Sequence, residues 1–145
     1  MAIYALPEPP LSFFKHYHQQ LIELSVGPDS RRYVIAEEGP RHYIDLDDYA
    51  EPDSLPLYWP AAVARYGEDT LLAHGIVPWY DYFTYKKLIK AFAGRDGARI
   101  LRLAADLSHY VADAHVPLHT TANYNGQLSG QEGIHAFWET RLPQL

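Results

Sequence analysis

The chain of 145 residues contains no cysteine, which excludes disulfide bonds and metal sites built on thiolates. Any metal ion would therefore be held by nitrogen and oxygen atoms, and the cellular compartment stays open. No apolar run approaches the roughly 18 residues of a membrane-spanning helix, so we expect no transmembrane segment. The first ten residues also lack the basic and apolar regions of a signal peptide.

Positive charge is scarce as well. The sequence has 12 Lys and Arg against 18 Asp and Glu, a formal net charge of −6. This balance argues against non-specific binding to a nucleic-acid backbone. It does not exclude a nuclease, because bound zinc ions would bring positive charge to the phosphate. Nearly half of the residues are apolar or aromatic, so the composition and length predict one folded domain over residues 1–145.

Apolar residues recur at helical spacing along much of the chain, and no stretch alternates like a β-strand, so the sequence predicts an all-α fold. A region rich in Pro, Asp, Glu and Gly, Pro28–Pro56, is expected to be a long ordered loop. Asp96 is the expected N-cap of one helix. The predicted helices are Leu11–Val26, Leu57–Ala73, Pro78–Ala93, Gly97–Ala114 and Gly133–Arg141.

Histidines and carboxylates in the last third of the chain are spaced for metal binding. His109 and Asp113 are four residues apart in a predicted helix, so both lie on one face. His135 and Glu139 repeat this spacing, and His119 lies between the two pairs. One such pair alone is usually a solvated helix face with a local ion pair. Two pairs with an intervening histidine indicate a metal site, and imidazole with carboxylate suits zinc.

These residues resemble a known family. The run His109-Tyr-Val-Ala-Asp113-Ala-His-Val-Pro-Leu-His119, followed by His135-Ala-Phe-Trp-Glu139, is similar to the zinc site of bacterial zinc-dependent phospholipase C and the related single-strand-specific nucleases. The resemblance implies an all-α phospholipase C/nuclease-like bundle with a long loop that carries further ligands. It also implies an extracytoplasmic protein, because the family is typically exported.

The resemblance extends upstream, where the family has an Asp and, about 14 residues later, a His before an aromatic residue. Asp29 and His42 match these two positions. The resemblance then implies two separate zinc sites and a role for Asp29 as the candidate general base. The first site would use Asp29, His42, His109 and Asp113, and the second would use His119, His135 and Glu139.

The chain departs from the family pattern at its start. In the family a third zinc ion is held by an N-terminal Trp, a following His and the residue that matches Asp113. This sequence begins Met-Ala-Ile-Tyr and has no Trp before Trp59. We therefore expect a chain shortened at its N-terminus that holds two zinc ions, against three in an intact family member. His16 and His18 are expected to be surface groups of the first helix.

The family resemblance implies hydrolysis of a phosphodiester by a zinc-dependent enzyme, with a phospholipase C-like activity as the leading hypothesis. A single-strand-specific nuclease with the same zinc site is the first alternative. A non-catalytic fragment stabilised by metal is the second. The substrate is accordingly a phospholipid or single-stranded nucleic acid, and the sequence leaves the oligomeric state open.

Overall fold

A computed structural model describes residues 2–142, and the ends of the expected domain, residue 1 and residues 143–145, lie outside the described residues. Within residues 2–142 the ordered elements are all helical, which confirms the all-α prediction. None of the helices described is both long and apolar enough to span a membrane.

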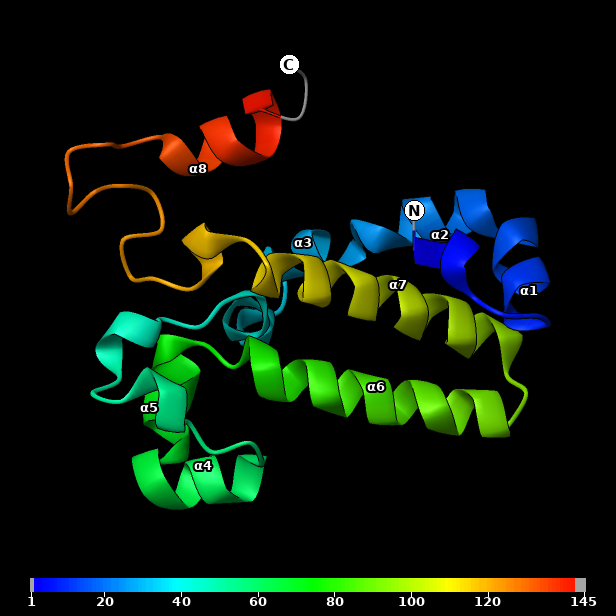
Figure 1. The fold of residues 1–145 in the computed structure, drawn as a ribbon, viewed down its shortest axis with the longest axis horizontal. Coiled ribbons are helices and arrows are strands. Elements are labelled where there is room, and N and C mark those ends of the chain that lie inside the picture. Colours follow the sequence, from blue (N-terminus) through cyan, green and yellow to red (C-terminus); the bar gives the residue numbers. More distant parts are fainter. Residues whose placement is uncertain (1, 143–145) are drawn as a thin grey trace.

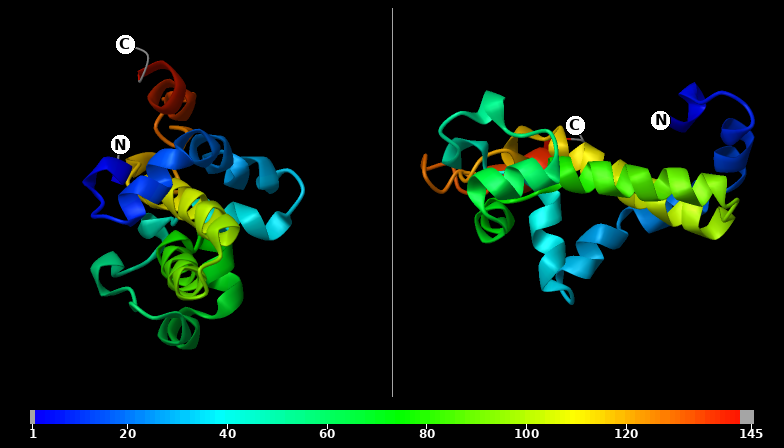
Figure 2. Two further views of the ribbon diagram at one scale, coloured as in Figure 1. Left: turned by 90° about the vertical axis from the view of Figure 1, so that its right-hand side faces the viewer. Right: turned by 90° about the horizontal axis from the view of Figure 1, so that it is seen from below.

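Two long helices form the centre of the molecule. Helices α6 (Val77–Ala93) and α7 (Gly97–Ala114) run antiparallel and side by side (Figures 1 and 2). The expected cap of α7 is confirmed, because the side chain of Asp96 accepts a hydrogen bond from the backbone N–H of Arg99 at 3.0 Å. Helix α6 begins one residue before the predicted start, with Pro78 in its first turn.

The N-terminal helices cover one end of this pair. Helix α1 spans Pro10–His16 and α2 spans His18–Ser25, after a one-turn 3₁₀ helix η1 (Ala2–Ala5). The prediction of a single helix over Leu11–Val26 was wrong, because the chain bends at Tyr17. The bend allows both short helices to pack on the same core, which is formed by Phe14, Ala91, Ile100 and Leu101 with Leu21 and Leu24 against them.

The prediction of a loop over Pro28–Pro56 was also wrong in part. The segment is ordered, but it is mostly a series of short helices. Pro40 lies inside the second of these short helices, η2. Proline has no N–H to donate, which is consistent with a 3₁₀ rather than an α-helical turn. The elements are α3 (Gly27–Arg32), η2 (Ala36–His42), η3 (Leu46–Asp48) and η4 (Pro52–Ser54).

The helix predicted over Leu57–Ala73 is two helices, α4 (Trp59–Tyr66) and α5 (Glu68–His74). Gly67 separates them with a φ of 82°, a backbone conformation that side chains rarely allow. Both helices pack against the start of α6 in the second core, where the buried residues include Ala62, Leu71 and Trp79.

The C-terminal segment extends from the end of α7. A short 3₁₀ helix η5 (Pro117–His119) leads into a polar loop, residues 120–130, and the last predicted helix consists of a single α-turn and a π-helical turn. These are α8 (Ile134–Ala136) and η6 (Phe137–Arg141), which lie away from the α6–α7 pair in Figure 1.

Candidate metal centre

Four of the predicted ligands lie together between α3, η2 and α7. We call Asp29, His42, His109 and Asp113 the first cluster. Nδ1 of His42 lies 3.2 Å from Nε2 of His109. Oδ1 of Asp29 lies 3.8 Å and 3.6 Å from these two nitrogens. Two ligands of one tetrahedral zinc ion are separated by about 3.4 Å when each bond is about 2.0–2.1 Å long. The spacing of the first cluster is therefore close to that of a metal site.

Asp113 completes the first cluster from one turn further along α7. Its Oδ2 atom lies 2.8 Å from Nδ1 of His42 and 3.3 Å from Nε2 of His109. Burial favours a raised pKa for Asp113, but hydrogen bonds with His109 and His42 outweigh it and lower the pKa to about 2. For His109, burial lowers the pKa, and hydrogen bonding to Asp113 overcomes it and raises the pKa above its usual value. The contact between Asp113 and His109 therefore favours the ionised carboxylate of Asp113 beside the protonated imidazole of His109.

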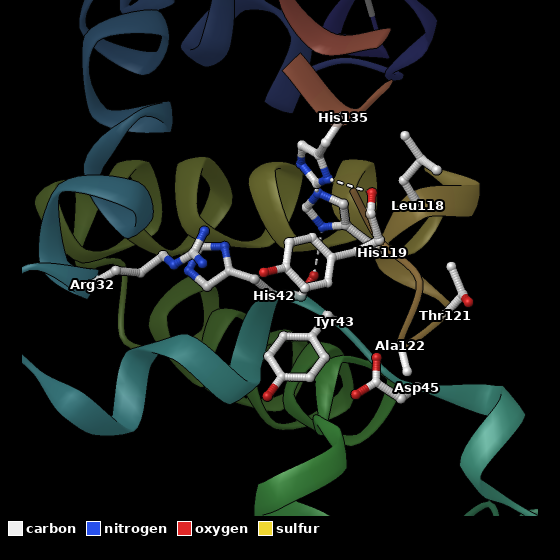
Figure 3. A pocket seen from close by; sticks show the side chains of 10 residues that line it. Arg32, His42, Tyr43, Asp45, Leu118, His119, Thr121, Ala122 and His135 are labelled. Carbon is white, nitrogen blue, oxygen red and sulfur yellow. Dashed lines mark hydrogen bonds between the residues drawn. The ribbon is translucent and has the colours of Figure 1, made fainter. Parts of the chain in front are cut away.

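The remaining three predicted ligands form a second cluster, which consists of His119, His135 and Glu139. The imidazoles of His119 and His135 stack with ring centroids 4.9 Å apart (Figure 3), and their Nε2 atoms are 3.3 Å apart. Oε1 of Glu139 lies 2.9 Å from Nε2 of His119, and Oε2 lies 3.2 Å from Nε2 of His135. The predicted pair of His135 and Glu139 thus lies against His119, which is 16 residues before His135 in the chain.

The hydrogen bonds behind the second cluster determine which ring nitrogens are free. Nδ1 of His119 donates to the backbone carbonyl of His42 at 2.8 Å, and Nδ1 of His135 donates to that of Tyr124 at 3.2 Å. With the protons on Nδ1, both Nε2 atoms present lone pairs to each other and to a carboxylate. Such an arrangement is stabilised by a cation at its centre, and backbone carbonyls commonly orient metal-binding imidazoles in this way. The residues of the second cluster therefore suit a divalent metal ion.

The two clusters are neighbours. The carbonyl of His42 holds His119, as described above, and the backbone N–H of Ile44 donates to the carbonyl of His119 at 2.9 Å. Oδ1 of Asp113 also lies 3.8 Å from Nδ1 of His119. The segment that follows α7 is therefore fixed against η2. As a result, the positions of His42 in the first cluster and His119 in the second depend on each other.

A pocket of about 400 Å³ opens beside both clusters, and His42, His119 and His135 line it (Figure 3). Arg32 is the cation in its lining, and its Nη1 lies 3.7 Å from Oδ1 of Asp29. The other lining residues are Tyr43, Asp45, Leu118, Thr121, Ala122 and Tyr124.

The other histidines lie outside the two clusters. His16 and His18 are exposed, as the sequence predicted for them, and His115 is exposed as well. His74 is at the end of α5, and its Nδ1 lies 2.9 Å from Oδ2 of Asp48. Together with Asp45, these two residues form a third group whose potential ligand atoms lie within 4.8 Å of one another. An ion pair at a helix C-terminus accounts for His74 without a metal.

Three further carboxylates lie near the clusters. Glu38 is completely buried, and its Oε1 lies 3.9 Å from Nε2 of His42. Asp47 accepts hydrogen bonds from Thr121 and from the backbone of Ala122, which ties the polar loop to η3. Asp81 has a buried carboxyl oxygen on α6. Asp45 makes no ion pair with His42 among residues 2–142.

The fold and the two clusters define an all-α protein with two sites suited to divalent metal ions. Comparison with protein-family models, curated proteins and solved structures finds no match to the chain.

Proposed function

We propose that the protein is a zinc-dependent phosphodiester hydrolase of the phospholipase C type. The observation that carries the proposal is the pair of converging clusters, made of histidine nitrogens and carboxylates, beside one pocket. Bound zinc ions would offset phosphate charge and lower the pKa of a water molecule toward neutrality. The ligands would be Asp29, His42, His109 and Asp113 in one site and His119, His135 and Glu139 in the other.

Asp29 and Arg32 have different roles in this proposal. The side chain of Asp29 is 57% exposed, and its Oδ1 faces the imidazoles of His42 and His109. A carboxylate in this position can accept the proton that the attacking water loses. Arg32 lines the pocket with an exposed guanidinium group, which can bind two phosphate oxygens at once.

Arg31, the other arginine of α3, is not available for phosphate. Its guanidinium group donates to Glu38, Asp106 and Tyr110 at distances of 3.0 to 3.3 Å. The hydrogen bonds of Arg31 point to a structural role, so Arg32 is our choice for contact with the substrate.

A single-strand-specific nuclease is the second candidate. Tyr43 and Tyr124 both line the pocket, and aromatic rings beside a phosphate site can stack on unpaired bases. A phospholipase C-like enzyme would instead bind a lipid headgroup in the same pocket.

The proposal is tested by hydrolysis of bis(p-nitrophenyl) phosphate by chelator-treated protein before and after zinc is returned. We expect activity to appear with zinc and to be lost in Asp29→Asn. Arg32→Ala is expected to raise KM much more than it lowers kcat. Phosphatidylcholine vesicles and single-stranded DNA then distinguish the two substrate classes. A zinc-loaded chain that hydrolyses none of the three would be a non-catalytic, metal-stabilised protein.

A further inference from the structure

A buried carboxylate lies directly behind the first cluster. Glu38 is 0% exposed, and a charged side chain is rarely buried to this extent unless it is paired. Its Oε1 accepts hydrogen bonds from Nε and Nη2 of Arg31, at 3.3 and 3.1 Å, and from the hydroxyl of Tyr110. Its Oε2 accepts from Arg41. We call Glu38, Arg31, Arg41 and Tyr110 the Glu38 network.

The Glu38 network remains polar and charged in the folded chain. Burial favours a raised pKa for Glu38, but donation by Tyr110 and Arg31 outweighs burial and lowers the pKa. Burial and the hydrogen bond to Glu38 raise the pKa of Tyr110 far above its usual range, so its hydroxyl stays protonated and continues to donate. Glu38 is therefore an ionised acceptor that holds its partners in place.

Each of the three segments that the network joins carries a ligand of the first cluster. Arg31 is two residues after Asp29 on α3, and Tyr110 is next to His109 on α7. Glu38 itself lies four residues before His42 in η2. A single carboxylate thus fixes the separation of segments that are up to 79 residues apart in the sequence.

One ring nitrogen of His42 links this network to the metal-binding atoms. The side chain of His42 is 1% exposed, and its Nδ1 faces the other ligands of the first cluster. Its Nε2 is buried without a hydrogen-bond partner in residues 2–142, and Oε1 of Glu38 lies 3.9 Å away. When Nδ1 provides its lone pair to a metal ion, the ring proton is on Nε2, toward this negative charge. A carboxylate on that side favours the required tautomer and makes the imidazole a better ligand.

We propose that Glu38 is a positioning residue for the first cluster, where it holds α3, η2 and α7 at the separation that zinc requires and favours the proton on Nε2 of His42. This inference rests on the proposed function only in that the first cluster binds zinc. It makes the second cluster an internal reference, because His119, His135 and Glu139 do not contact Glu38 through any hydrogen bond or ion pair within residues 2–142.

The test is the affinity of each cluster for zinc, measured by competition with a chromogenic chelator. His135→Ala isolates the first cluster, and His109→Ala isolates the second. In the His135→Ala background, Glu38→Gln is expected to weaken zinc binding at the first cluster by about 10- to 100-fold. This is the usual effect of removing a group that supports a metal ligand. In the His109→Ala background the same substitution is expected to have a much smaller effect, because Glu38 reaches the second cluster only indirectly, through the carbonyl of His42 that accepts from His119. Asp106→Asn is the matched control, since Asp106 contacts Arg31 but not Glu38.

A second readout separates positioning from simple stability. The ¹⁵N chemical shifts of the His42 ring report which nitrogen carries the proton, and we expect the Nε2–H form to lose population in Glu38→Gln. If Glu38→Gln does not fold, Tyr110→Phe removes one donor to Glu38 with less change in packing and is expected to weaken the first cluster alone. An unchanged affinity of the first cluster, or an equal loss in both clusters, in a folded variant would overturn the inference. Absence of hydrolysis by the zinc-loaded wild-type chain would instead overturn the proposed function and leave this result standing.

Discussion

The two ring nitrogens of His119 have different partners, and this difference is informative. Nδ1 is committed to the carbonyl of His42, whereas Nε2 faces His135 and Glu139. A neutral imidazole has only one proton, so Nε2 is left as an acceptor beside two other acceptors. The side chain is also buried, which makes an uncompensated cluster of this kind costly.

We therefore expect His119→Ala to remove about one zinc ion per chain and to lower thermal stability, because metal binding contributes to the free energy of folding. Elemental analysis of the purified variants provides the count. His115→Ala is the matched control, since His115 is an exposed histidine at the C-terminal end of α7, where its Nδ1 hydrogen-bonds to the carbonyl of Val111. Equal zinc contents in the two variants would contradict the assignment.

Asp81 makes the metal-free protein sensitive to pH. Burial, together with the charge of Asp113, raises the pKa of Asp81 to about 7, and one of its oxygens has no hydrogen-bond partner in the described part of the chain. The unfolded chain ionises at its ordinary pKa near 3.8. Between these two values the folded chain binds the additional proton, so the free energy of unfolding decreases as the pH rises from about 4 to about 7.

Asp81→Asn is expected to be more stable than the wild type above about pH 7 and nearly equal to it near pH 4. The full shift corresponds to about 4 kcal/mol at most, and solvent screening reduces the measured gain. Urea denaturation in the presence of chelator, at several pH values, provides the comparison. A difference between the two proteins that does not change with pH would exclude this role for Asp81.

The sequence predicted which candidate ligands come together better than it predicted the groups that support them. His109 and Asp113 could be paired because a helix fixes the distance between residues i and i+4. Glu38 could not be recognised, because its partners Arg31 and Tyr110 are brought to it only by the tertiary fold.

At the level of elements, the connection between α5 and α6 supports the pocket. Gly75 has a φ of 88°, and a Cβ atom at this position would lie 2.2 Å from the backbone oxygen of Tyr43. Tyr43 follows His42 and lines the pocket. The backbone N–H of Val77 also donates to the same oxygen at 3.2 Å, so the segment after α5 contacts the segment after η2.

Gly75→Ala is expected to destabilise the protein by about 2 kcal/mol or more, since the substitution adds backbone strain and a steric clash. It is also expected to weaken zinc binding at the first cluster, because Tyr43 must move. Chemical denaturation and chelator competition are the measurements. Gly39→Ala is the control, because a Cβ atom there would have no neighbour within 4 Å. Equal stabilities of these two variants would show that the contact with Tyr43 relaxes without cost.

Helix boundaries were predictable where the sequence contains a clear start or stop. Helix α7 has the predicted bounds because Asp96 caps its start and Pro117 follows its end. Apolar periodicity alone did not reveal the break at Gly67, since the pattern continues across it. The short helices between Gly27 and Ser54 were missed because each has at most seven residues, too few for an apolar period to show in the sequence.

At the scale of the whole molecule, the candidate metal sites join segments that lie far apart in the sequence. The first cluster connects α3 and η2 to α7, and the second connects the C-terminal segment to η5. Large side chains in that segment remain exposed, among them Tyr124, Phe137 and Trp138. The second cluster therefore supplies a substantial part of the attachment of α8 and η6.

Removal of zinc is accordingly expected to release the C-terminal segment before the helical pair α6–α7 unfolds, because local openings begin where few apolar contacts are buried. Limited proteolysis with chymotrypsin, followed by mass spectrometry, should show cleavage after Tyr124 and Phe137 that becomes at least about tenfold faster with chelator, as expected for a loss of about 1.4 kcal/mol in the local stability. Tyr82 and Tyr85 on α6 are also exposed and provide the internal control. His135→Ala should be cut rapidly even when zinc is present. Uniform acceleration at all four sites would instead mean that the metal stabilises the whole fold, and unchanged cleavage would mean that the second cluster does not anchor this segment.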